Sequence, residues 1–189
     1  MCAAPAKTSD EAIVAAAREI VAESGATELS MQAVAEAVRV RAPSLYKRFP
    51  SRDALLDAVA LGVLAELGAK MERAGRGRVG VGALEAMARG YRDFAKRSPH
   101  LYRLLFTKRV ESADLDRARA AAVRPVIEAL ANVVADPADR LPAARMLTAF
   151  LHGFVTMEID GAFHLHGDVP RAFEFAIAKI LAGLESRPS

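Results

Sequence analysis

The sequence predicts an all-α protein in which a small N-terminal domain of three helices precedes a larger helical domain, with about nine helices in total. Apolar residues make up 52% of the 189 residues and aromatic residues only 6%, with no Trp, a composition typical of packed helices. Apolar positions recur at helical spacing along the chain, and no alternating strand pattern is evident. A chain of this length can bury a real core as one large domain or two small ones.

The first helix is expected to begin at Ser9 or Asp10, whose side-chain oxygen can accept a hydrogen bond from an otherwise unpaired N–H, and to end at Gly25. Residues 1–8 before it, including the single cysteine Cys2, are expected to form a disordered tail. Its apolar positions are Ile13, Ala16, Ala17, Ile20 and Val21.

Three further caps define the next helices. Ser30 caps a short second helix, and Pro43 suits the first turn of a third, where its missing N–H costs nothing. Pro50 is expected to end the third helix, and Ser51 to cap a fourth that extends to residue 73. The apolar faces are Met31, Val34, Ala35 and Val38 on the second helix, Leu45 and Phe49 on the third, and Leu55, Leu56, Val59, Val63 and Leu67 on the fourth.

A glycine- and arginine-rich segment, residues 74–80, is the best candidate for a linker. Beyond it, five amphipathic helices are predicted at about 81–97, 99–107, 112–134, 138–159 and 168–184. We therefore expect a helix-turn-helix domain at 9–55, a connecting helix and linker at 56–78, and a second domain at 79–189.

The charge pattern matters more than the total charge. The net charge of +3 is modest, but the stretch from Arg39 to Arg52 holds five basic residues and no acidic one. One cysteine allows no disulfide within the chain. An apolar signal core is absent, and no apolar run approaches about 18 residues, so we expect a soluble cytoplasmic protein without a membrane anchor.

The basic stretch has the features of a helix-turn-helix. Ala35 is the small residue where two helices cross closely, Arg39 occupies the tight turn, and Val40 and Leu45 pack the helices together. Glycine is favoured at such a turn because φ is often positive there. Arg39 would cost roughly 1 kcal/mol if its backbone is left-handed.

The second helix of this pair is expected to enter the major groove of DNA. Bases and backbone phosphates would be contacted by different side chains. The expected base-edge residues are Arg41, Ala42, Pro43 and Ser44, and the expected backbone contacts are Ser30, Gln32, Tyr46, Lys47, Ser51 and Arg52. The alternative is a solvated basic face in an unrelated helical bundle.

The segment from Val34 to Leu56 closely resembles the DNA-binding signature of the TetR/AcrR family of one-component transcription regulators. The resemblance covers roughly residues 9–60 and rests on a Val-Ala pair, a turn, the triplet Ser44-Leu45-Tyr46 and a basic residue before Leu55-Leu56. It implies a homodimer on a palindromic operator, usually a repressor released by a small ligand. It also implies phosphate contacts for Tyr46 and Arg52, with Arg41, Pro43 and Ser44 lining the groove. Arg39 replaces the usual glycine of the family.

Three segments of the second domain, 91–95, 98–106 and 151–158, resemble a C-terminal subgroup of that family named for a Trp-His-Gly-type motif. The match is partial, because Leu151 stands where a Trp can occur. Wide apolar faces on the last two helices suit a four-helix bundle between two subunits, although the monomer's own core could use the same faces. The expected interface residues are Phe154, Met157, Glu158, Phe173, Ile177, Ile180 and Leu181.

A pocket for a small hydrophobic or aromatic effector would be lined by aromatic residues with a few polar partners, a composition that also describes a core. The candidates are Tyr91, Phe94, Tyr102, Phe106, Met146, Phe150 and His152. Pairs such as His164 and His166 do not make a metal site, which needs three or four ligands, so no metal or other cofactor is expected.

The sequence thus predicts a ligand-responsive DNA-binding regulator. The alternative is a helical ligand-binding or protein-interaction module that has lost DNA recognition, which Arg39 alone motivates. Without a phosphate-binding glycine loop or a nucleophile elbow, the sequence has no catalytic constellation, and we expect no enzyme.

Overall fold

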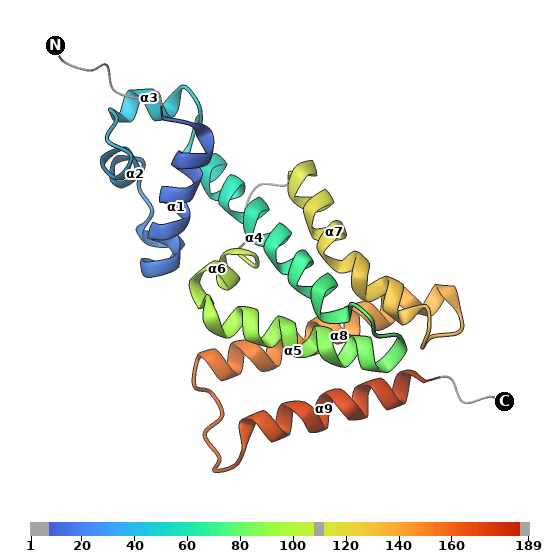
Figure 1. The fold of residues 1–189 in the computed structure, drawn as a ribbon. Coiled ribbons are helices and arrows are strands. Elements are labelled where there is room, and N and C mark those ends of the chain that lie inside the picture. The colour runs from blue at the N-terminus through green and yellow to red at the C-terminus, as the bar shows by residue number, and fades with distance from the viewer. Residues whose placement is uncertain (1–7, 108–111, 186–189) are drawn as a thin grey trace. The chain divides into compact units, whose positions relative to one another are not determined.

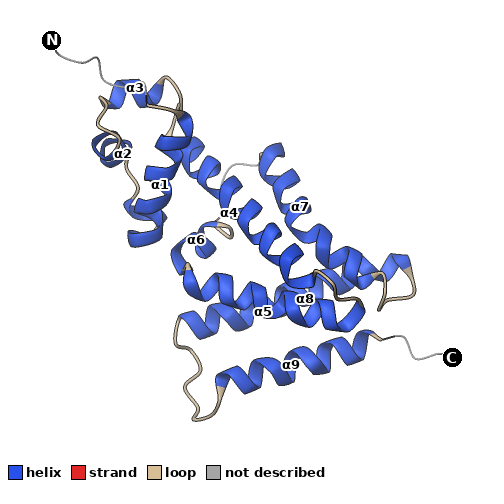
Figure 2. Ribbon diagram, in the orientation of Figure 1, coloured by secondary structure: helices blue, strands red, loops and turns tan. Residues whose placement is uncertain are grey.

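The computed structural model describes residues 8–107 and 112–185, and every regular element in these ranges is helical (Figures 1 and 2). The predicted all-α fold is confirmed. No helix in the described ranges is long and apolar enough to cross a membrane. The predicted tail, with Cys2, lies outside these ranges except for Thr8.

The elements are α1 (Asp10–Ser24), the 3-10 helix η1 (Ala26–Glu28), α2 (Met31–Ala37), α3 (Ala42–Tyr46), α4 (Arg52–Gly75), α5 (Gly80–Arg97), α6 (Pro99–Leu104), α7 (Ala113–Leu130), α8 (Pro137–Ile159) and α9 (Val169–Leu184).

The chain forms two compact units. The first consists of Met1–Val63 with Ser98–Leu115, and the second of Leu64–Arg97 with Asp116–Ser189. The long helix α4 contributes its first half to one unit and its second half to the other. The first unit thus adds α6 to the three predicted N-terminal helices.

The predicted caps of the first unit are present. The Ser9 hydroxyl accepts the Ala12 N–H at 3.2 Å at the start of α1, and Gly25 ends that helix with a φ of 88°. The Ser30 hydroxyl accepts the Ala33 N–H at 3.1 Å at the start of α2. These local bonds fix the helix starts because they satisfy donors that have no partner inside the helix.

Helix α3 begins as predicted, with Pro43 in its first turn and Leu45 fully buried, but it ends at Tyr46 rather than at Pro50. The N–H groups of Arg48 and Phe49 both donate to the Leu45 carbonyl, at 2.9 and 2.8 Å. Because both N–H groups share one acceptor, the chain forms a tight turn here and does not continue as a helix.

Helix α6 packs against α1 and η1 in the first unit. Gly25 faces the His100 ring, and a Cβ at Gly25 would lie 3.3 Å from His100 Nδ1, so the helices meet where a side chain is missing.

The predicted helix 99–107 ends at Leu104, because the next three N–H groups bond to carbonyls three residues back. Helix α7 also ends early, at Leu130 instead of 134, in a similar turn.

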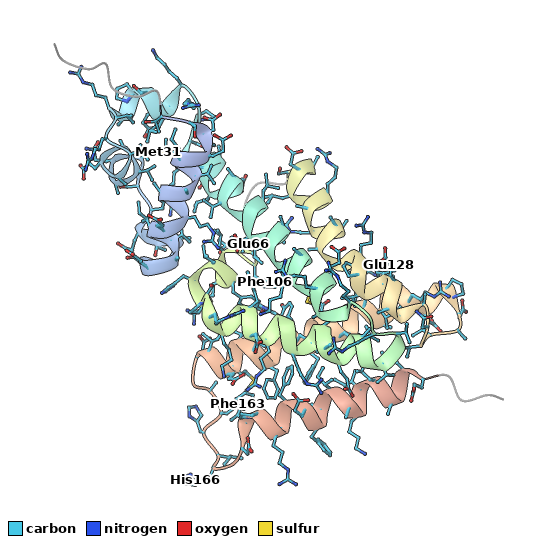
Figure 3. The ribbon with its side chains drawn as sticks, in the orientation of Figure 1. Met31, Glu66, Phe106, Glu128, Phe163 and His166 are labelled. Atoms are coloured by element: carbon cyan, nitrogen blue, oxygen red, sulfur yellow. The ribbon has the colours of Figure 1, made fainter. Side chains whose placement is uncertain are left out.

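The second unit is built on α5, α8 and α9, which contact one another pairwise (Figure 1). Four rings gather between α8, α9 and the loop that joins them, which carries Phe163 (Figure 3). Measured between ring centroids, Phe154 lies 4.9 Å from Phe163 and 5.3 Å from Phe173, and Phe150 lies 6.2 Å from Phe173. Helix α4 meets α7 at Gly68, where a Cβ would come 3.1 Å from the Ala122 Cα.

Three residues predicted at a dimer interface are used inside the protomer instead. Phe173 and Leu181 have no exposed surface and Ile177 is only 2% exposed, because these positions form the inner face of α9. Helix α9 is apolar on more than one side, so its periodicity did not show which side faces inward.

An ion-pair cluster joins α5 to α8 beside the rings. Arg92 donates from Nε and Nη2 to the two carboxylate oxygens of Glu158, at 2.8 and 2.6 Å, and Lys96 Nζ lies 2.5 Å from Glu158 Oε1. The Arg92 guanidinium also lies 4.9 Å from the centroid of the Phe173 ring. The hydrogen bond from Arg92, more than that from Lys96, holds the pKa of Glu158 below its usual value. Glu158, another predicted interface residue, is thus committed to contacts inside the protomer.

Replacing Glu158 with Gln should lower the free energy of unfolding at neutral pH by about 1–3 kcal/mol, because the half-buried Arg92 loses its charged partner. The lowered pKa means that the carboxylate stabilises the fold fully above its ordinary value of 4.5 and loses this effect as the pH falls through the lowered folded value. In urea unfolding, the difference between wild type and E158Q should therefore shrink at acid pH. D116N, which breaks an exposed pair with Arg119, is the control and should be near neutral. A difference that stays constant down to acid pH would contradict this assignment.

Candidate nucleic-acid interface

The turn between α2 and α3 sets the direction in which α3 leaves α2. Arg39 has a φ of 56° and is the one non-glycine residue with positive φ in the described part of the chain. Its N–H donates to the Glu36 carbonyl at 3.1 Å, and the Val40 N–H donates to the Ala35 carbonyl at 2.9 Å. This pair of bonds is the Schellman arrangement, which requires a left-handed residue at this position. The sequence left the backbone conformation at Arg39 open; the structure makes it left-handed, which costs roughly 1–2 kcal/mol with an arginine.

Beyond the turn, a short exposed segment carries the residues expected at DNA bases. Arg41 flanks α3 in an extended conformation, and Pro43 and Ser44 are exposed on its first turn. Tyr46 is 51% exposed, although its neighbour Leu45 is fully buried. Leu45 anchors the helix, so the polar side chains around it point toward solvent.

Two of the five cations in this stretch are engaged within the first unit. Arg48 Nε lies 2.5 Å from an Asp10 carboxylate oxygen, and Arg48 also donates to the Thr8 carbonyl. Arg52 Nε donates to the Leu29 carbonyl at 2.7 Å, and its Nη2 donates to the Ala26 carbonyl. Arg52 therefore ties the start of α4 to the segment that leads into α2. Sequence reasoning missed this role, because a backbone carbonyl as acceptor leaves no trace in the residue pattern.

Three of the other expected backbone contacts, Ser30, Gln32 and Ser51, are polar residues at helix starts. The hydroxyls of Ser30 and Ser51 accept the N–H groups of Ala33 and Ala54, each at 3.1 Å. A hydroxyl that accepts at a cap can still donate its own proton to a phosphate. Gln32 Nε2 donates to Glu36 Oε1 at 2.7 Å and keeps its second amide hydrogen.

Three cations of the stretch have no ion pair among the described residues. Arg39, Arg41 and Lys47 are exposed, at the turn, at the start of α3 and directly after its end. Unpaired, exposed cations at both ends of a presented helix form a surface of positive potential for a polyanion. We call this surface, formed by residues 39–47, the reading head.

The expected ligand residues divide between the two units. Tyr102 and Phe106 lie on or just after α6 in the first unit, with ring centroids 5.1 Å apart, and the other five lie in the second. Tyr91 and Phe94 are buried on α5, whereas Met146 is 44% exposed on α8. Partial burial lowers the pKa of His152. No single unit contains the whole predicted set.

Apolar side chains remain exposed on the outer side of α8 and α9. Met157 is 44% and Phe175 is 64% exposed, and the Lys179 ammonium lies 5.7 Å from the Phe175 ring centroid. Phe154 and Ile180, also expected at an interface, are half-buried. His166 lies out on the α8–α9 loop (Figure 3), and no group of three or more His, Cys, Asp and Glu in the described ranges could hold a metal ion.

Comparison with protein families matches both parts of the chain. The family model described as "Bacterial regulatory proteins, tetR family" matches residues 13–59. The model described as "Tetracyclin repressor-like, C-terminal domain" matches residues 84–180. Together they cover the helix-turn-helix and most of the second part of the chain.

Curated relatives agree with the family models. The chain is 32% identical over 188 residues to the uncharacterized HTH-type transcriptional regulator Rv0681 of Mycobacterium tuberculosis, covering 98% of this chain and 85% of the relative. It is 30% identical over 176 residues to the uncharacterized HTH-type transcriptional regulator YobS of Bacillus subtilis, covering 91% of this chain and 90% of that one.

Solved structures share the fold. A protein of unknown function from Rhodococcus sp. RHA1 superposes with a TM-score of 0.79 at 24% identity, covering 98% of this chain and all of that one. A single-residue variant of TetR from Acinetobacter baumannii AYE, solved in complex with minocycline, has a TM-score of 0.67 at 22% identity, covering 94% and 96% of the two chains.

Replacing Arg52 with Ala should lower the free energy of unfolding by about 1.5–3 kcal/mol, because two charge-assisted hydrogen bonds to carbonyls are lost. R52K should not restore stability, since an ammonium cannot reproduce the planar fork that reaches both carbonyls. Urea unfolding followed by circular dichroism measures both. The control R41A, at an exposed position, should change stability by less than about 0.5 kcal/mol. An R52K variant as stable as wild type would show that the fork is not needed.

Proposed function

The chain belongs to the TetR family of helix-turn-helix transcription regulators, and on this premise we propose that it is a repressor that binds a palindromic operator as a cytoplasmic homodimer and leaves it when a small hydrophobic or aromatic ligand binds. The observation that carries the proposal is the group of exposed cations around α3 that have no ion pair among the described residues. Members of this family are regulators rather than enzymes.

The geometry supports distinct roles for the residues on this surface. Arg41 has the fork that binds guanine through two hydrogen bonds, and Ser44 can donate to or accept from a base edge. Ala42 and Pro43 offer only apolar contact, for example to a thymine methyl group. Backbone phosphates would be contacted by Tyr46, Lys47, Ser30, Ser51 and Gln32. Arg52 supports the surface from behind through its carbonyl contacts, and a phosphate contact by its remaining N–H groups stays a prediction.

We assign the residues at 9–55 to DNA recognition, those at 56–78 to connection, and those at 79–189 to ligand binding and dimerisation. The dimer would form through the outer sides of α8 and α9, where Met157 and Phe175 are exposed. Large exposed apolar side chains on adjacent helices are typical of a subunit contact. A symmetric pair of reading heads would then face a palindrome, since a two-fold dimer presents identical surfaces.

Ligand release requires that one helix responds to both sites. Helix α4 is shared by the two units, and α6 packs against α1 in the unit that carries the reading head. The related fold of the Acinetobacter baumannii TetR variant is known with minocycline bound, which supports a ligand site in the second part of this chain as well. By linkage, operator and ligand would each weaken the binding of the other by the same factor.

The direct test is a genomic binding selection with the purified, folded dimer. We expect enrichment of one inverted repeat whose half-sites lie about one helical turn apart. Return of no enriched palindrome would leave the chain as a helical ligand-binding module without DNA recognition.

Arg41→Gln and Lys47→Gln should separate base recognition from phosphate binding. R41Q should cost about 1–3 kcal/mol per half-site and change the preferred base at one position. K47Q should weaken binding to all duplexes and reduce the slope of log K against log salt by about 1 per phosphate contact. Fluorescence anisotropy on the operator and on a scrambled duplex measures both effects. Arg124→Gln, an exposed arginine of α7, is the matched control and should change neither. Equal effects of R41Q on both duplexes would contradict a base contact.

Phe175→Glu should convert the dimer into monomers at micromolar concentration, because it places a charge in an apolar contact. Sedimentation velocity measures the mass. Val79→Glu, at a position 79% exposed outside α8 and α9, is the control and should remain dimeric. If F175E sediments as a dimer, the interface lies elsewhere.

A further inference from the structure

The fold does not require an arginine at the α2–α3 turn. Both hydrogen bonds of the turn are made by the backbone, from the N–H groups of Arg39 and Val40, and the Arg39 side chain takes no part in them. Glycine gives the same left-handed conformation without the contact between Cβ and the carbonyl that disfavours other residues. A strained non-glycine residue that the fold does not need is a reason to look for a function.

Ion pairing among the described residues of the first unit does not explain the Arg39 side chain. Arg39 is exposed, and the acidic residue nearest to it in sequence, Glu36, accepts the Gln32 amide at 2.7 Å. Asp53, the first acidic residue after the basic stretch, lies 3.6 Å from Arg52. Among the described residues, therefore, no carboxylate is paired with the Arg39 guanidinium.

The Arg39 charge can also stabilise the fold, and this effect on stability has to be distinguished from an effect on DNA binding. The last turn of α2 carries no basic residue, so a cation directly after it interacts favourably with the negative end of the helix dipole. This interaction needs only a charge, and it would be measured as a gain in stability.

The position of Arg39 suits a different partner. It stands two residues before Arg41, next to the start of the helix proposed to enter the groove. Because Arg48 and Arg52 are engaged with Asp10 and with backbone carbonyls, Arg39 is one of three cations of the basic stretch that have no ion pair among the described residues. A planar guanidinium with five donors binds a phosphodiester through two oxygens.

We propose that Arg39 is a further DNA contact, in which its guanidinium binds a backbone phosphate at the edge of the groove, and that the left-handed strain is the stability given up for this contact. The inference rests on the proposed function and deepens it, because it adds a backbone contact at a position where the family usually has glycine.

The experiment compares three variants of the full-length dimer. R39G removes both strain and charge, R39Q removes charge but keeps the strain, and R39K keeps both. Thermal unfolding and anisotropy titrations, on the operator and on a scrambled duplex at several salt concentrations, are measured for each. Arg124→Gln serves as the control for loss of an exposed arginine.

We expect stability and affinity to move in opposite directions in R39G. Its midpoint of unfolding should rise by about 2–4 °C, whereas its affinity for both duplexes should fall roughly three- to tenfold, with the salt slope reduced by about 1 per reading head. R39Q should show the same loss of affinity without the gain in stability. R39K should retain most of the affinity and the salt slope.

Three results would overturn the inference. Wild-type affinity and salt slope in R39Q and R39G would show that Arg39 contacts no phosphate. A loss restricted to the operator would mean a base contact instead. A fall in the unfolding midpoint of R39Q, with unchanged affinity, would mean that the charge serves only the dipole of α2. Failure of the proposed function is distinct, because wild-type protein would then not distinguish the operator from the scrambled duplex.

Discussion

The left-handed turn after α2 is the constraint on which the surface proposed to face DNA depends. Two backbone hydrogen bonds, to the carbonyls of Glu36 and Ala35, turn the chain so that α3 can begin at Ala42, three residues after Arg39. A helix of five residues has little stability of its own, since helices shorter than about 12 residues are marginal in water. Its orientation therefore comes from this turn, from the buried Leu45, and from Arg52, which fixes the start of α4 to the segment before α2.

The local features of the fold could be predicted from the sequence, and the long-range ones could not. The caps at Ser9, Ser30 and Ser51 depend on a few adjacent residues, so the pattern was sufficient; at Arg39 the pattern marked the position of the turn but not its backbone conformation. The carbonyl contacts of Arg52 span 23 and 26 residues, and no sequence pattern marks a carbonyl as an acceptor. The sequence did not predict the early ends of α3 and α6. After each helix the same backbone N–H groups can bond to carbonyls of a turn or of a continued helix, and the residue pattern does not distinguish the two.

The second part of the chain shows how a wide apolar face misleads. Helix α9 has Phe173 and Ile177 inside and Phe175 outside, and all three would suit either a core or an interface. Only the packing distinguishes a core residue from an interface residue. Phe173 is a core residue because its ring stacks against Phe150 and lies under the Arg92 guanidinium. The Arg92–Glu158 pair then fixes the register of α5 against α8, because two parallel hydrogen bonds tolerate little sliding. The apolar pattern therefore says little about the ligand and dimer residues, and their roles stay predictions, as do those of the exposed residues Arg41 and Ser44.

The absence of a side chain at Gly68 sets the distance between α4 and α7. A single methyl group there would come 3.1 Å from the Ala122 backbone, closer than the two helices can tolerate without moving. Backbone cannot rotate out of the way as a side chain can, so a larger residue at 68 would push α4 and α7 apart. The spacing of these two helices thus depends on an atom that is absent, and a residue as small as alanine at 68 would already change it.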